Sequence, residues 1–316
     1  MKTAFTLIAC AACSLAGADS APQQRWDLGA ASRYDYTDID PVRQRLFLTR
    51  GDHVQVLDLA TGKQQGEIAA TRGVHGVAFA QDLKLGFTSN GGANSVTVFE
   101  LDTLKVRKEV PVSGQNPDAI LYEPVSHKLY TFNGKSKDVS VLDAASMTAV
   151  ATIKVGGKPE FAVADGAGRI FVNIEDKADL VVIDVASNSV SATWHLAGCE
   201  EPTGLAYDAR HARLFSVCQN RKMIVTDATS GRQVAQLTIG EHPDAVVFDP
   251  ASATVYSSNG AGTISVIGQS DADHYQVKAT LTTAKGARTM AMDYAGGRIY
   301  LPFVADQQFN VVVVKP

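Results

Sequence analysis

Short apolar segments alternate with polar turns along most of the chain, and this pattern predicts strands. The apolar segments are rich in Val, Ile, Phe and Tyr, and Gly, Pro, Asn and Asp bound them. No segment of about ten residues has apolar positions at a helical period. One stretch illustrates the pattern, with strands predicted at 119–122, 129–132, 139–142 and 149–155. The sequence therefore predicts an all-β protein.

The predicted strands belong to a repeated unit. One landmark of the repeat is a strand that ends in an acid or a turn residue, and it recurs every 41 to 43 residues at Asp58, Glu100, Asp143, Asp184, Asp227 and Gly268. A unit of this length with four strands is typical of a β-propeller blade, for which about 40–50 residues are usual. A seventh copy ends the chain at 311–314.

Seven sheets of four strands cover one another's faces when they pack radially around an axis, which leaves only short edges. We therefore expect a seven-bladed β-propeller. The last unit lacks a fourth strand at its C-terminal end, and the segment 24–28 near the N-terminus has no blade of its own. We expect this segment to supply the outer strand of the last blade and to close the ring.

Residues 1–18 read as a secretory signal peptide. Lys2 precedes a short apolar run, and small residues follow at Ala16, Gly17 and Ala18. The run is shorter than the roughly 20 residues that a membrane span needs. The expectation is a periplasmic or secreted protein whose mature part, 19–316, is a single propeller domain without a membrane span.

Two cysteines remain after that cleavage, Cys199 and Cys218. An even pair in an exported chain predicts a disulfide, because the compartment is oxidising. The repeat register also brings the two cysteines to neighbouring strands. Two buried thiols are the alternative.

Three segments resemble a known repeat. The stretches 86–90, 129–133 and 255–259 (Gly-Phe-Thr-Ser-Asn, Leu-Tyr-Thr-Phe-Asn and Val-Tyr-Ser-Ser-Asn) each precede a strand of the Val-Ser-Val-Leu-Asp type. They resemble the YVTN-type β-propeller repeat, and the mature chain is similar to the YncE-like family. The resemblance implies an exported propeller and implies little about activity, since this fold hosts many functions.

Connectivity suggests where a ligand would bind. The start of each inner strand and the hairpin between the second and third strands emerge on the same face, so they place polar residues around a central funnel. The predicted ligand-binding residues are Asp35, His75, Asp118, Glu160, Thr203, His242, Asp244 and Arg288. Carboxylates are ligands for hard cations, so the candidate metal ligands for a divalent cation such as Ca²⁺ are Asp35, Asp118, Glu160 and Asp244.

Each feature of the funnel also has a purely structural interpretation. Acids at the start of a strand bond to backbone N–H groups. The Asn-Gly pairs at 90–91, 133–134 and 259–260 are interpreted as tight turns with positive φ.

The function predicted is that of an exported, non-enzymatic binding or scaffold protein with a small polar ligand, a cation or a partner segment at the funnel. A metal-assisted lactonase or hydrolase acting in the same funnel is the alternative. No Gly-x-Ser-x-Gly nucleophile motif is present. The formal charge of −4 argues against a nucleic-acid partner, which usually selects a basic surface. A monomer is expected.

Overall fold

A computed structural model describes residues 23–316. The predicted signal peptide and its cleavage site lie outside these residues. Within them, no helix has the length and apolar character needed to cross a membrane.

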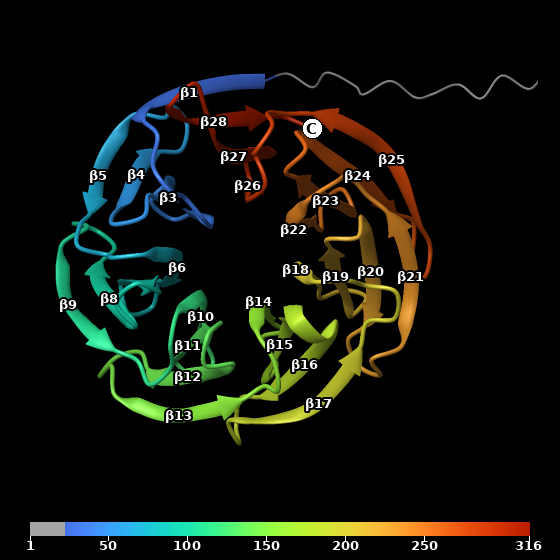
Figure 1. The fold of residues 1–316 in the computed structure, drawn as a ribbon, viewed down its shortest axis with the longest axis horizontal. Helices are drawn as coiled ribbons and strands as arrows, with labels where there is room; N and C mark the ends of the chain where they lie inside the picture. Colours follow the sequence, from blue (N-terminus) through green and yellow to red (C-terminus); the bar gives the residue numbers. More distant parts are fainter. Residues whose placement is uncertain (1–22) are drawn as a thin grey trace, which may run out of the picture.

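Seven four-stranded antiparallel sheets form a ring, which confirms the predicted fold (Figure 1). The first three blades are β2 (Thr37–Asp40), β3 (Arg45–Thr49), β4 (Val54–Asp58) and β5 (Gln64–Ile68); β6 (Val74–Ala80), β7 (Leu85–Asn90), β8 (Ser95–Glu100) and β9 (Val106–Pro111); β10 (Pro117–Glu123), β11 (Lys128–Asn133), β12 (Asp138–Asp143) and β13 (Ala149–Lys154). The next three are β14 (Pro159–Ala164), β15 (Arg169–Ile174), β16 (Asp179–Asp184) and β17 (Ser189–His195); β18 (Pro202–Asp208), β19 (Arg213–Cys218), β20 (Lys222–Asp227) and β21 (Gln233–Thr238); β22 (Pro243–Asp249), β23 (Thr254–Asn259), β24 (Thr263–Gln269) and β25 (Tyr275–Thr282). A short 3₁₀ helix, η1 (Glu175–Lys177), joins β15 to β16.

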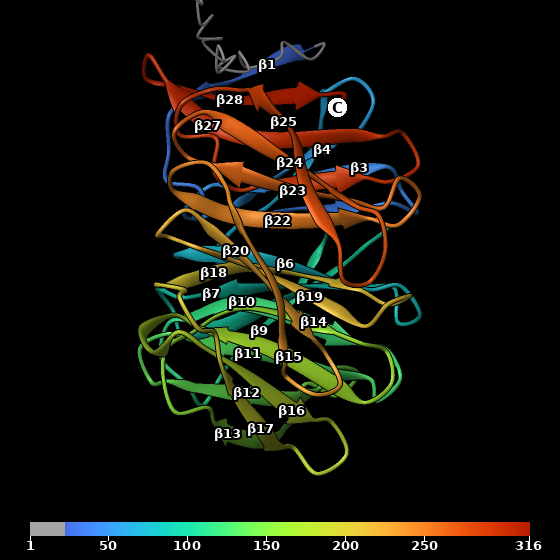
Figure 2. The same cartoon turned by 90° about the vertical axis from the view of Figure 1, so that its right-hand side faces the viewer.

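The seventh blade combines both ends of the described chain. It contains β26 (Ala291–Asp293), β27 (Arg298–Ala305), β28 (Gln308–Val314) and β1 (Gln23–Ala30). Strand β1 pairs antiparallel with β28 on the rim, with Trp26 opposite Val311, and the two strands also lie together in the edge view (Figure 2). The prediction that the N-terminal segment closes the ring is confirmed.

The core lies between neighbouring blades. One buried cluster joins the first and last blades, with Leu46 and Leu57 packing against Tyr300 and Phe309. All four side chains are fully buried. Burying a large apolar side chain stabilises a fold by about 1.5–3 kcal/mol, so each blade gains from the neighbours on both its faces.

The acid landmark of the repeat has a local explanation. The carboxylates of Asp58, Asp143, Asp184 and Asp227 accept the backbone N–H three residues ahead, at 2.7–2.9 Å. Each acid therefore holds the turn between the third and fourth strands of its blade, as Asp side chains commonly do in turns.

The two cysteines form a disulfide. Cys199 lies in the loop before β18 and Cys218 ends β19, with their Cα atoms 5.5 Å apart. The bond ties the start of an inner strand to the second strand of the same blade, and the predicted pairing is confirmed.

Candidate ligand site at the polar mouth

The inner strands surround a channel, and one end of this channel is polar. The seven residues that define this polar mouth are Asp35, His75, Asp118, Lys158, Glu160, Asp244 and Arg288. They lie at or just before the starts of the inner strands β2, β6, β10, β14, β22 and β26. Because all inner strands run in the same direction along the axis, these residues gather at one face of the ring, as the connectivity predicted.

Backbone bulges place many of these side chains. In β6, β10, β14, β18 and β22 the register shifts immediately after the first residue of the strand. The residues within these shifts include His75, Asp118, Glu160, Thr203 and Asp244. A bulge adds a residue to one strand and re-aims side chains, which is how a regular blade can present polar groups next to the axis.

Asp35, His75 and Asp118 form the tightest cluster of the mouth. Nδ1 of His75 donates to Oδ2 of Asp35 at 2.5 Å and lies 3.4 Å from Oδ1 of Asp118. One ligand atom from each residue lies within 4.8 Å of the others. The His75 side chain is only 9% exposed, so the cluster sits below the rim.

The other two acids of the mouth also have cationic neighbours. Nζ of Lys158 lies 3.2 Å from Oε2 of Glu160 and also pairs with Glu175 of η1. Arg288 reaches Oδ2 of Asp244 at 3.4 Å. Four like charges in a narrow opening would repel one another, and the structure balances them with His75, Lys158 and Arg288.

Burial governs the charge states of the acids. Burial raises the pKa of Asp118 to about 6, against the opposing charge of His75. Burial also raises the pKa of Asp244 to about 6, although Arg288 opposes the shift. Asp35 adds to both shifts, so the three carboxylates interact across the axis.

The bases respond to these acids in the opposite way. Burial disfavours the charged imidazole, but the hydrogen bond to Asp35 and the charge of Asp118 raise the pKa of His75 overall. Burial likewise opposes the charge of Lys158, yet Glu160 and Glu175 raise the pKa of that amine. The mouth therefore carries charges of both signs near neutral pH.

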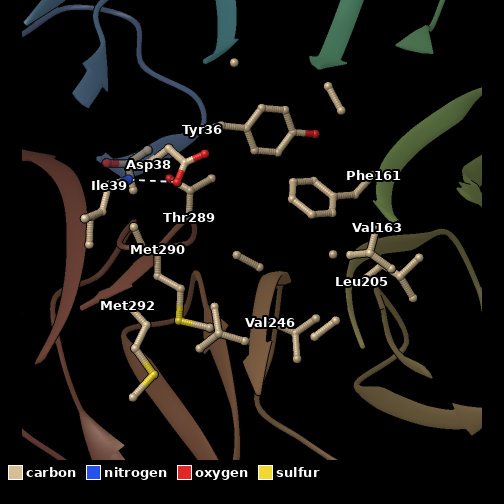
Figure 3. Close-up of a pocket in the computed structure, with 18 of the residues that line it drawn as sticks. Tyr36, Asp38, Ile39, Phe161, Val163, Leu205, Val246, Thr289, Met290 and Met292 are labelled. Carbon is tan, nitrogen blue, oxygen red and sulfur yellow. Dashed lines mark hydrogen bonds between the residues drawn. The ribbon is translucent and has the colours of Figure 1, made fainter. Parts of the chain in front are cut away.

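Two aromatic rings form a floor under the polar mouth. The rings of Tyr36 and Phe161 lie 5.3 Å apart and tilt by 57°, and they face each other in the close-up (Figure 3). The Tyr36 hydroxyl reaches the Glu160 carbonyl oxygen at 3.4 Å. Below this floor the channel continues as an apolar cavity.

Tyr36 and Phe161 were not predicted as site residues, because aromatic residues in a strand resemble ordinary core residues. The repeat does contain a signal for them. The corresponding position in the other blades is small in every case, being Gly76, Ala119, Gly204, Ala245 and Thr289. A Cβ on Gly76 would lie 3.2 Å from Ile120 and 3.5 Å from Tyr36, so the small residue leaves room for the ring.

Two predicted ligand residues stand apart from the charged groups. Thr203 is buried, and its hydroxyl lies within hydrogen-bond distance of the carbonyls of Val217 and Pro243 at 3.3 and 3.1 Å, linking two blades. His242 is exposed with a φ of 57°, and it has no ion pair within residues 23–316.

The prediction that the Asn-Gly pairs form tight turns with positive φ was wrong. Asn90, Asn133 and Asn259 are fully buried strand residues with no positive φ. Asn90 donates to the hydroxyls of Ser95 and Thr97 at 3.1 and 2.8 Å, so its amide ties two strands together. The left-handed residues of these hairpins come later, at Asn94, Lys137 and Gly262.

Comparison with the sequences of known proteins finds one partial relative and no family. No protein-family model matches the chain. Antigen Lp49 of Leptospira interrogans is 27% identical over 110 residues, which is 33% of this chain and 24% of that protein. The match thus spans about a quarter of the length of this curated relative.

Comparison by structure finds other propellers. A chain of Kuenenia stuttgartiensis hydrazine synthase superposes with a TM-score of 0.77 at 17% identity, covering 88% of this chain and 94% of that one. A chain of a mitotic checkpoint complex gives 0.82 at 13% identity and coverages of 100% and 98%. The U3-55K structure gives 0.82 at 10% identity and coverages of 94% and 99%. At these identities the likeness shows the fold alone.

Proposed function

We propose that this chain is an exported, non-enzymatic binding protein whose polar mouth holds a small zwitterionic ligand. One observation carries the proposal: cations and carboxylates alternate around one opening, at 2.5–3.4 Å from one another. A ligand that carries both charges can replace these internal ion pairs, with its ammonium group bound to the carboxylates and its carboxylate bound to the cationic side chains. Export and membership of the YncE-like family are part of the proposal and rest on the sequence.

Exposure suggests how the ligand would be oriented. The Arg288 side chain is 47% exposed and its ion pair with Asp244 is long, at 3.4 Å, so its guanidinium can bind a carboxylate at the rim. Asp35 and Asp118 lie deeper, with side chains 19% and 12% exposed, and they suit a cationic group. The aromatic floor of Tyr36 and Phe161 adds a surface that attracts cations. Free amino acids and short peptides have this charge arrangement.

Calorimetry with a panel of amino acids and dipeptides tests the proposal. We expect heat with zwitterions, and a loss of about tenfold in affinity for Arg288→Gln, since a hydrogen bond to a charged group contributes about 1.5–3 kcal/mol. N-acetylated and esterified analogues are the matched ligands that lack one charge. Asp249→Asn, on the opposite face, is the control variant. The absence of binding across the panel, or equal binding of the blocked analogues, would contradict the proposal.

A metal site in the mouth is the second candidate, and the spacing of Asp35, His75 and Asp118 favours it. One imidazole and two carboxylates suit Zn²⁺ or Mn²⁺ better than Ca²⁺, which prefers oxygen ligands. A bound cation with an open position would support metal-assisted hydrolysis of a lactone or ester. Titration with Zn²⁺, Mn²⁺ and Ca²⁺, followed by lactone hydrolysis with and without chelator, tests this candidate. Chelator-sensitive turnover that His75→Gln abolishes would replace the binding function with an enzymatic one.

A further inference from the structure

An apolar cavity lies in the other half of the channel, below the floor of Tyr36 and Phe161. Its volume is about 700 Å³. That size is within the roughly 300–1,000 Å³ of sites for small organic molecules. All seven inner strands or the segments beside them contribute to its wall, and side chains from widely separated blades point into it (Figure 3). Neither the polar mouth nor its proposed ligand accounts for this space.

The wall is apolar and adaptable. Val163, Leu205, Val246, Met290 and Met292 line it. Methionine side chains are flexible and polarisable, so they fit ligands of different shape. An apolar wall of this extent favours a ligand with an apolar body, because binding removes that surface from water.

The charged groups of the wall are all acidic. Among the lining residues there is no Lys, Arg or His, and the acids are Asp38 and Asp293. The Asp293 carboxylate accepts the N–H of Gly296 at 3.0 Å and is buried in the turn after β26. Asp38 differs, since its Oδ1 accepts the N–H of Ile39 at 2.7 Å and no cation pairs with it within residues 23–316.

The surroundings of Asp38 make it a recognition group for a cation. Asp38 is an exposed residue that lines the channel. The protein around it still limits the hydration of its carboxyl, and this desolvation raises its pKa to about 7. The hydrogen bond from Ile39 opposes this shift and the charge of Asp40 adds to it. Tyr294, 55% exposed nearby, has its pKa raised to about 12 by burial of its hydroxyl and by Asp38, so it stays uncharged. Near pH 8 the cavity thus holds an uncompensated negative charge.

We propose that this cavity is a second binding site, for a small apolar amine whose ammonium group pairs with Asp38 and whose body packs against Val246, Met290 and Met292. The ammonium supplies the cation that Asp38 lacks, and the apolar part fills the wall. This inference does not depend on the zwitterion site, because none of the seven polar-mouth residues lines the cavity; the two sites share only Tyr36 and Phe161 at their border.

The probe is 2-(1-naphthyl)ethylamine, and its matched neutral analogue is 2-(1-naphthyl)ethanol. Calorimetry at pH 8 is expected to show the amine binding about tenfold more tightly than the alcohol, which is the usual effect of one charge-assisted contact. Asp38→Asn is expected to remove this preference while leaving the affinity for the alcohol within about twofold. Val163→Trp, which fills the cavity, is expected to weaken both ligands, and its fold is checked by thermal melting.

Control measurements locate the amine. Asp118→Asn, in the polar mouth, is expected to leave amine affinity unchanged. Lowering the pH from 8 to 6 is expected to weaken amine binding to the natural protein and not to Asp38→Asn, since the amine stays protonated like a lysine. Equal affinities for amine and alcohol, a preference that survives Asp38→Asn, or a loss caused by Asp118→Asn would each overturn the proposal. So would the absence of binding of either ligand at about 1 mM.

Discussion

Single residues set the charge of the polar mouth through burial rather than through their chemical type. Asp118 and Asp58 are both aspartates of the same repeat protein, but their surroundings shift their pKa values in opposite directions. Burial raises that of Asp118 to about 6, whereas hydrogen bonds from Thr61 lower that of Asp58 in its exposed turn. Ionisation of Asp118 therefore lowers the free energy of unfolding, whereas ionisation of Asp58 raises it.

Asp118→Asn tests this difference. Asp118 binds a proton more tightly in the folded state than in the unfolded state, so its contribution to stability falls as pH rises from about 4 through 6. Relative to the natural protein, the variant should gain on the order of 2 kcal/mol between pH 4 and pH 7. The charged groups that act on Asp118 are His75, Asp35, Lys158 and Asp244.

The measurement is a series of urea unfolding curves across this pH range. Asp58→Asn is the control. Because the pKa of Asp58 is lowered from its usual 3.8, this carboxyl is already ionised above pH 4, and the stability of the variant relative to the natural protein should stay nearly constant across the range. A constant difference between Asp118→Asn and the natural protein at every pH would show that the carboxyl is not perturbed by folding.

At the scale of elements, each blade is a common four-stranded sheet whose inner strand is locally irregular. The register shifts at the starts of β6, β10, β14, β18 and β22 coincide with the positions of the mouth residues. In β18 the disulfide lies next to this irregularity, because Cys218 is paired with Pro202, the first residue of the strand. The bond thus holds an inner strand in place where its ladder is interrupted.

Replacing both cysteines, Cys199→Ala with Cys218→Ala, should lower the free energy of unfolding by about 3 kcal/mol, because a loop of this length is no longer closed in the unfolded chain. Denaturant titration measures the loss. Reductant should shift the natural protein by a similar amount and leave the double variant unchanged. If reductant affects both proteins equally, or neither, the bond is not a stabilising element.

At the scale of the molecule, stability depends on closing the ring. Strand β1 completes the last blade, and Trp26, 7% exposed, packs 5.6 Å from the ring of Tyr300 beneath it. Without β1, solvent would reach the edge of β28. It would also reach one face of the apolar cluster between the first and last blades. Both channel sites depend on this closure, since residues of the first and seventh blades line them.

Deleting residues 23–30 should abolish the cooperative thermal transition, because the two ends of the array lose their connection. Trp26→Ala is the matched variant. It should retain a cooperative transition and lower stability by about 3–5 kcal/mol, the usual cost of truncating a buried aromatic side chain. Calorimetric melting of both proteins checks this, and an unchanged transition after the deletion would mean that β1 does not close the ring.

The repeat by itself determined the architecture. Strand length, the step of 41 to 43 residues and the unpaired segment near the N-terminus were sufficient to predict seven blades and their closure, because each blade is a local structure that only needs a neighbour on each face. The same register identified the polar residues near the axis.

Only the tertiary structure decided how those residues are used. Contacts between blades pair His75 with Asp35 and Arg288 with Asp244, and the Thr203 hydroxyl lies against the Pro243 carbonyl of the next blade. The aromatic floor and the cavity with Asp38 also arise between residues that are far apart in the chain. Ion pairs, burial and cavity shape depend on all seven blades at once, so no single repeat contains them.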